Sequence, residues 1–191
     1  MKIVSLFLCL LLKPLFAIET FVVDMNSNTN VASVEVVKEF AESEFTDGNF
    51  GSASFLCEYL EKRNVDDPKF KLIWATAQSK IGNWNKAETL YLKVVHHNRA
   101  SKRQKSLACV YISKQQTDTK AKEEYATLAV KYSADDLVVD MVSQIYRDLE
   151  IDALSRSDAK KAEYYRTKYE EFIKNSTKRN KNEVGLETTG F

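Results

Sequence analysis

Apolar residues recur at the three-to-four-residue spacing of amphipathic helices on both sides of the stretch Ile81 to Tyr91, IGNWNKAETLY. The pattern predicts one helix from about Pro68 to Ile81 and a second from about Asn85 to His97. Asp66 and Asp67 stand directly before Pro68, which suits a helix start, because a carboxylate caps free amides and proline needs no donor there.

Composition extends this helical prediction to the whole chain. Its 191 residues include only 5 glycines and 2 prolines, and 44% are hydrophobic. Few helix breakers and enough apolar material for one core favour a single all-α domain over a sheet-rich fold.

The chain contains an internal repeat. The segment GNFGSASFLCEYL from Gly48 aligns with GNWNKAETLYLKV from Gly82, which sets the interval at 82 − 48 = 34. A third copy begins at Gln116, where QTDTKAKEEYATL lacks the glycine and the aromatic residue. Three alanines nevertheless keep the same spacing, and so do three small residues upstream of them: Ala53, Ala87 and Ala121; Ala41, Ala75 and Cys109.

A 34-residue unit of two helices with these features resembles the tetratricopeptide repeat. The resemblance implies an α-solenoid of antiparallel helix pairs, a TPR-like superhelix, in which small residues allow close helix approach and an aromatic residue fills the space beside them. It places repeats at about 34–67, 68–101 and 102–135. The residues assigned to repeat packing are Ala41, Gly48, Phe50, Ala53, Trp74, Ala75, Gly82, Trp84, Ala87, Tyr91, Cys109, Ala121 and Tyr125. The alternative is an unrelated helical bundle with accidental periodicity.

Beyond the third repeat, the helical phase continues through Val142, Ser143 and Tyr146 and then fails. We therefore predict C-terminal capping helices over 136–174. The polar segment 175–191 is predicted to be a disordered tail.

The segment 1–17 has the pattern of a secretory signal peptide, with Lys2 before an apolar run from Ile3 to Leu12. Cleavage is expected after Ala17, which makes residues 18–33 an extended linker and the protein exported, either periplasmic or secreted. An uncleaved membrane anchor is the alternative, but this apolar run is short for a span.

Charge and cysteine content constrain the partners and the redox chemistry. Without the segment 1–17, which contains Lys2 and Lys13, 26 basic residues face 27 acidic ones, a net charge of −1. This balance argues against a nucleic-acid partner. Cys57 and Cys109 lie one whole repeat apart, so we expect two buried thiols without a disulfide.

The sequence offers no recognisable catalytic or metal-binding motif, so we expect no enzyme activity and no cofactor. His96 and His97 are the only histidines and have no further ligands at a recognisable spacing. A small metal-binding protein or enzyme that uses these two histidines remains an alternative.

The resemblance implies a concave face, lined by the first helix of each repeat, that binds a protein or peptide. Its predicted groove residues are Lys38, Lys69, Leu72, Thr76, Lys80, Arg103, Ser106, Val110 and Lys114. The lysines and Arg103 would favour an acidic peptide or a free carboxylate. The family's carboxylate clamp for chaperone tails fits poorly, because Glu42, Ile73 and Leu107 occupy its other positions.

These observations predict an exported scaffold for protein–protein interaction. An exported repeat protein is similar to bacterial adaptors that assemble pili, secretion channels or outer-membrane complexes. A self-associating structural module, whose exposed repeat end stacks on another copy, is a second alternative.

Overall fold

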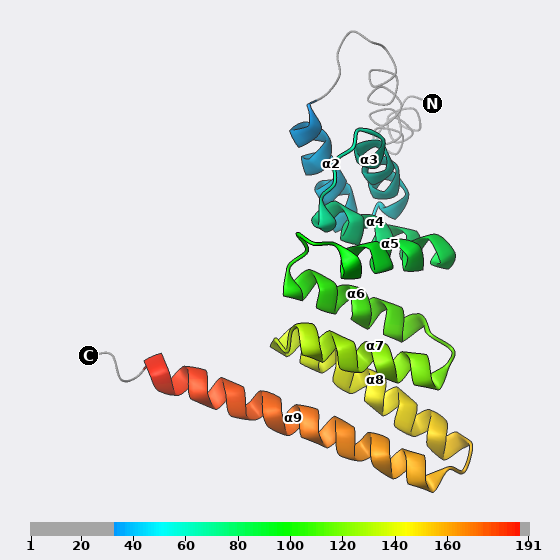
Figure 1. Ribbon diagram of the computed structural model, residues 1–191, viewed down its shortest axis with the longest axis vertical. Coiled ribbons are helices and arrows are strands. Elements are labelled where there is room, and N and C mark those ends of the chain that lie inside the picture. Colours follow the sequence, from blue (N-terminus) through cyan, green and yellow to red (C-terminus); the bar gives the residue numbers. More distant parts are fainter. Residues whose placement is uncertain (1–32, 188–191) are drawn as a thin grey trace, which may run out of the picture.

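The computed structural model describes residues 33–187, and these form eight α-helices and no strand (Figure 1). The predicted signal peptide and almost all of the predicted linker lie outside the described residues. The helices are α2 (Val34–Thr46), α3 (Phe50–Lys62), α4 (Pro68–Lys80), α5 (Trp84–His96), α6 (Lys102–Gln115), α7 (Thr119–Tyr132), α8 (Asp136–Ser155) and α9 (Ala159–Glu187).

Every second helix begins at the interval of the sequence repeat. The helices that start one interval apart are α2 at Val34, α4 at Pro68, α6 at Lys102 and α8 at Asp136. The residue before each start caps it, because its side-chain oxygen accepts a backbone N–H of the first turn. These four capping residues are Ser33, Asp67, Ser101 and Asp135.

The helices form a stack of antiparallel pairs that runs from α2 and α3 at one end to α9 at the other (Figure 1). We call α2, α4, α6 and α8 the inner helices, because each also packs against the next member of this set. The helices α3, α5, α7 and α9 are the outer helices. The prediction of an all-α solenoid is confirmed. Among the described residues, no helix is both long enough and apolar enough to cross a membrane.

The small residues assigned to repeat packing are buried in the first two pairs. Ala41 and Ala53 in the first pair, and Ala75 and Ala87 in the second, are fully buried. Large side chains fill the space beside them: Tyr91 is fully buried and stacks on Tyr111 at a centroid distance of 5.4 Å. The pairs are therefore closely packed.

Aromatic residues of the repeat fill space both between and within the pairs. Trp74 is 6% exposed and its indole Nε1 donates a hydrogen bond to Ser54 Oγ at 3.1 Å. Trp84 is partly buried against the core, 6.2 Å from the Tyr91 ring, and Phe50 packs edge-on to Phe45 at 5.7 Å. These rings fill space within the domain.

Cys57 in α3 and Cys109 in α6 are both free and buried. Burial raises the pKa of each thiol to about 12. At neutral pH the nucleophilic thiolate is therefore scarce, and both residues act as small apolar packing groups.

The glycine of the repeat makes a left-handed turn between paired helices. Gly48 has φ +81° and Gly82 has φ +87°. The residue after each glycine, Asn49 or Asn83, donates its N–H to a carbonyl five positions earlier, at 2.8 Å in both turns. Glycine is favoured here because a side chain destabilises this backbone conformation.

The same turn occurs between α8 and α9, which the sequence pattern did not reveal. Ser157 has φ +58°, and the following Asp158 donates its N–H to Ala153 O at 2.9 Å. Helix α8 has 20 residues, whereas α4 has 13, a difference of 7. Such an insertion makes about two helical turns, which return side chains to nearly the same face. The pair α8–α9 is thus a lengthened fourth repeat, and the phase fails after Tyr146 only because of this insertion.

The third turn, between α6 and α7, has no residue with positive φ. Asp118 caps α7 instead, and its carboxylate accepts the N–H of Ala121 at 2.8 Å. Ala121 is consequently a first-turn residue and is only partly buried, as is Tyr125. Ala126 and Ala129 are the fully buried alanines of this helix.

Helix α9 continues to Glu187, so the backbone of residues 175–187 is helical where a disordered tail was predicted. This segment contains no proline and many lysine, arginine and glutamate residues. These residue types lose little side-chain freedom in a helix, and polarity alone does not exclude one.

The turn geometry predicts that removing a glycine from one turn lowers the free energy of unfolding, and that introducing a glycine into another turn raises it. Gly82→Ala should lower the free energy of unfolding by about 1 kcal/mol, because a methyl group disfavours positive φ. Ser157→Gly should raise it by about 0.5 kcal/mol for the converse reason. Urea denaturation followed by circular dichroism measures both.

Gly51→Ala is the matched control. Gly51 lies inside α3, and a Cβ built there has no neighbour within 4 Å. This substitution should stabilise the protein by about 0.5–1 kcal/mol. Equal effects of alanine at Gly51 and Gly82 would contradict the assigned turn.

Candidate partner-binding surface

The inner helices share one side that their neighbours leave partly open. Helix α4 packs against α2, α3, α5 and α6, and several of its less buried side chains form one stripe at helical spacing. That stripe contains Lys69, Leu72, Ile73 and Lys80. We call the corresponding side of all four inner helices the inner face.

A row of apolar side chains crosses the inner face. Ile73 in α4, Leu107 in α6 and Met141 in α8 are partly buried, and successive members are one repeat interval apart. Because equivalent residues of stacked repeats lie side by side, these three form a row from pair to pair. The equivalent residue in α2 is Glu39, so the row begins only at the second pair.

Helix α8 enlarges this apolar area. Leu137 and Ile151 are 48% and 59% exposed. Leu137 lies one helical turn before Met141, and Ile151 follows Leu137 by 14 residues, about four helical turns. Ile151 belongs to the part of α8 that exceeds the length of α4, so the lengthened helix extends the face by about two turns. Sequence reasoning missed these residues because this region was assigned to a cap.

The middle of the predicted groove is closed by packing within the domain. Thr76, Ser106 and Val110 are all buried, so a partner cannot contact their side chains. Tyr91 OH donates to Thr76 Oγ1 at 3.1 Å, and Ser106 Oγ donates to Ala129 O at 2.8 Å. Leu72 remains partly exposed at the surface.

Three of the predicted basic groove residues have acidic partners inside the chain. Lys69 Nζ lies 2.6 Å from Glu42 Oε1, which joins α4 to α2. Arg103 Nε lies 3.6 Å from Asp135 Oδ2, and Lys38 Nζ lies 3.9 Å from Glu35 Oε1. Their charges are therefore largely neutralised before any partner arrives.

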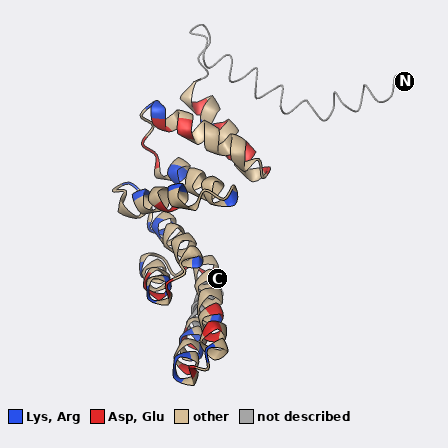
Figure 2. Ribbon diagram, turned by 90° about the vertical axis from the view of Figure 1, so that its right-hand side faces the viewer, with Lys and Arg blue, Asp and Glu red and all other residues tan. Residues whose placement is uncertain are grey.

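Lys80 and Lys114 are different, because both are exposed and neither forms an ion pair within residues 33–174. They lie at the C-terminal ends of α4 and α6, again one repeat interval apart. Elsewhere, positive and negative residues are interspersed along the helices (Figure 2). Lys80 and Lys114 thus mark one basic edge of the inner face.

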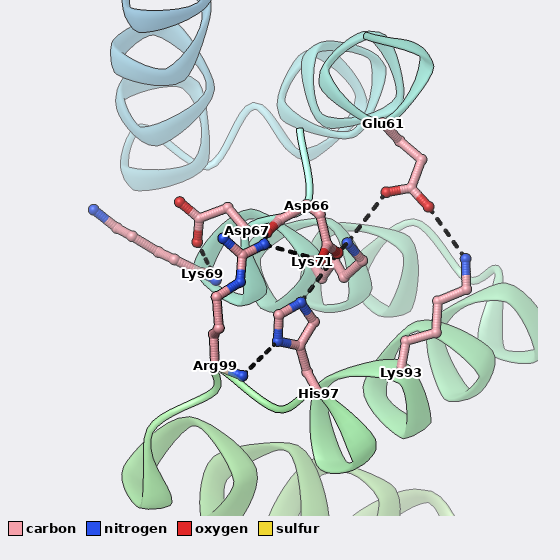
Figure 3. Close-up of polar contacts among 8 residues, drawn as sticks. All are labelled: Glu61, Asp66, Asp67, Lys69, Lys71, Lys93, His97 and Arg99. Atoms are coloured by element: carbon pink, nitrogen blue, oxygen red, sulfur yellow. Dashed lines mark hydrogen bonds and ion pairs between the residues drawn. The ribbon is translucent and has the colours of Figure 1, made fainter. Parts of the chain in front are cut away.

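A second polar cluster joins the first two pairs, around Asp66 in the connection before α4 (Figure 3). The Asp66 carboxylate accepts hydrogen bonds from Lys71 Nζ, from His97 Nε2 at 3.0 Å and from Arg99 Nη2 at 2.9 Å. These three donors hold the pKa of Asp66 well below its usual range, with Lys71 the largest cause. Lys71, whose side chain is only 9% exposed, also lies 3.5 Å from Glu61.

The geometry of His97 bears on the metal-binding alternative. Its Nδ1 accepts the backbone N–H of Arg99 at 3.1 Å, so the proton of the neutral ring lies on Nε2, which faces Asp66. Both ring nitrogens are therefore used within the fold. Among the described residues, no group of three or more His, Cys, Asp and Glu side chains is arranged to hold a metal ion. His96 is exposed beside this cluster.

Comparisons of the chain with protein-family models, with curated protein sequences and with solved structures gave no match. The arrangement of the helices and the chemistry of the inner face are therefore the basis for a functional proposal.

The Asp66 cluster predicts a pH-dependent contribution to stability. A carboxylate whose pKa is lowered by folding stabilises the folded state fully above its ordinary pKa of about 4, and this stabilisation is lost progressively as the pH falls from there through the lowered pKa of the folded state. Asp66→Asn should therefore lower the urea midpoint most at pH 7, and by less at pH 2.

Asp140→Asn is a suitable control, because Asp140 is an exposed carboxylate on α8 and forms no ion pair with the other described residues. It should change the midpoint little at either pH. A difference between Asp66→Asn and the parent chain that is equal at pH 7 and pH 2 would disprove the role assigned to this carboxylate.

Proposed function

We propose that this protein is a scaffold for protein–protein interaction that binds a segment of its partner on the inner face. The observation that carries the proposal is the partly exposed row Ile73, Leu107 and Met141, with Leu137 one turn from Met141 and Ile151 further along the same helix. Contiguous exposed apolar side chains bordered by polar ones are typical of protein-binding surfaces.

The inner face is suited to a peptide-like partner. Inner helices packed side by side are about 8–10 Å apart. A segment in the extended polyproline II conformation rises about 3.1 Å per residue with three residues per turn, so every third side chain lies on the same side and would meet the next member of the row. This spacing supports an extended segment that crosses the helices.

The basic edge supports a preference for acidic segments, but through only two of the basic residues that were predicted from the sequence. Lys69 and Arg103 already have acidic partners, whereas Lys80 and Lys114 form no ion pair among the described side chains. An acidic side chain or C-terminal carboxylate of the partner would therefore pair with Lys80 or Lys114. Apolar contacts along the row would supply most of the affinity.

The resemblance of the 34-residue unit to the tetratricopeptide repeat supports the same proposal, since that family works mainly by binding partners on such a face. We also propose that the protein is exported, on the basis of the segment 1–17, which lies outside the described residues. Export combined with a repeat scaffold agrees with a role in assembling an envelope complex of a bacterium.

A photo-crosslinking residue placed at Leu107 tests this proposal in the native compartment, with one at Thr89 as the control. Thr89 is exposed on outer helix α5. A protein captured from Leu107 and not from Thr89 is the expected result. N-terminal sequencing of the scaffold chain itself should begin at Ile18, and a chain that retains Met1 would contradict cleavage of the predicted signal peptide.

The captured partner then allows a quantitative test with purified proteins. Leu107→Asp should weaken its binding at least tenfold, about 1.4 kcal/mol, because a charge would be placed in the apolar row. Thr89→Asp should leave the affinity unchanged. Equal affinity of both variants, with circular dichroism confirming that both are folded, would exclude the inner face as the binding surface.

A further inference from the structure

An open cavity of about 660 Å³ lies beside the C-terminal end of α5, and we call it the α5 cavity. It is lined by Asp66, by the three residues that bond the Asp66 carboxylate, and by Lys93, His96 and Asn98. A volume of this size is within the range of small-molecule sites.

The α5 cavity lies on the side of α4 that is turned away from the inner face. Lys71 lines the cavity, whereas Lys69, two residues earlier, belongs to the inner-face stripe. Two residues correspond to about 200° around a helix, so these side chains leave α4 in opposite directions. A ligand in the α5 cavity would therefore not compete with a partner on the inner face.

Two polar side chains that line the α5 cavity are largely buried. The side chains of Lys71 and His97 are 9% and 10% exposed. A buried ammonium group is costly unless opposite charges compensate it, and Lys71 has two acidic partners, Asp66 and Glu61. The cavity is therefore part of the packed structure and differs from a group of exposed lysines.

Positive charge exceeds negative charge around the α5 cavity. Lys71, Lys93 and Arg99 contribute three positive charges (Figure 3). Asp66 and Glu61 contribute two negative charges, so 3 − 2 leaves a balance of +1. The two histidines add to this balance when they are protonated. The cavity thus favours an anion.

Several hydrogen-bond donors of the α5 cavity are not used within the fold. Arg99 contacts Asp66 through Nη2 alone, which leaves its Nε and Nη1 groups available. Lys93 has a single acidic partner at 3.2 Å, although an ammonium group has three donors. The side chains of His96 and Asn98 are exposed and form no hydrogen bond or ion pair within residues 33–174.

We propose that the α5 cavity binds a phosphate or sulfate group, either as the free ion or as part of a small organic molecule. The available donors belong to separate residues of α5 and of the connection that follows it. A tetrahedral oxyanion accepts hydrogen bonds from several directions, whereas a carboxylate is best matched by a planar fork of donors. This site goes beyond the proposed scaffold function and does not depend on it.

Histidine ring signals in the NMR spectrum of the protein isolated from cells test this site, because His96 and His97 are the only histidines of the chain. Inorganic phosphate, added at constant pH and low ionic strength to limit screening, should shift the His96 signal saturably. Acetate at equal ionic strength should shift it much less. The absence of a saturable shift with phosphate, or an equal shift with acetate, would overturn the proposal.

Lys93→Gln and Lys86→Gln form a matched pair for calorimetry with inorganic phosphate. Both lysines lie on α5 and pair with a carboxylate of α3, at 3.2 and 3.1 Å, but only Lys93 of the two lines the cavity. Lys93→Gln should weaken binding about tenfold, because a hydrogen bond to a charged group is lost. Lys86→Gln should weaken it less than about twofold. Equal effects of the two variants would contradict the assigned site.

His96→Ala is a second variant, and it leaves the fold intact because the His96 side chain has no partner within residues 33–174. It should weaken phosphate binding several-fold without changing the Tm. Affinity unchanged in both His96→Ala and Lys93→Gln would refute the site. Glycerol 3-phosphate distinguishes the two sources of the anion: a lower Kd than that of inorganic phosphate supports an esterified ligand, and a higher Kd supports the free ion.

Discussion

The close approach of paired helices at small residues is the constraint on which the structure depends. Ala41, Ala53, Ala75 and Ala87 are fully buried, and so is the large ring of Tyr91. A methyl group tolerates this proximity, whereas a larger side chain would force the helices apart. The repeat interval places this contact, the helix caps and the turns in register in successive pairs.

This register also creates the surface on which function is proposed to depend. Side chains at equivalent positions form rows across the inner helices, and rows that do not face another helix remain partly exposed. Ile73, Leu107 and Met141 form one such row. The closely packed interior beneath it, with Thr76 and Ser106 buried, makes the inner face a preformed surface. Preformed surfaces lose less conformational entropy on binding.

The sequence was sufficient to predict the helical architecture and its period, because the alanine positions recur three times, and the glycine position twice, at one spacing. It was insufficient beyond Tyr146, where the insertion in α8 shifts the alignment while preserving the helical face. Ser157 adopts the positive φ of a glycine turn, which its identity conceals. The groove residues were harder to predict, since burial of Ser106 and pairing of Lys69 with Glu42 depend on tertiary neighbours.

The most direct test of the central claim, that close contact at small residues sets the stack, is the unfolding free energy of Ala87→Leu. Overpacking this fully buried contact should lower it by about 1–3 kcal/mol. Ala159→Leu at the exposed start of α9 should change it by less than about 0.5 kcal/mol. An Ala87→Leu protein as stable as the parent chain would contradict this account.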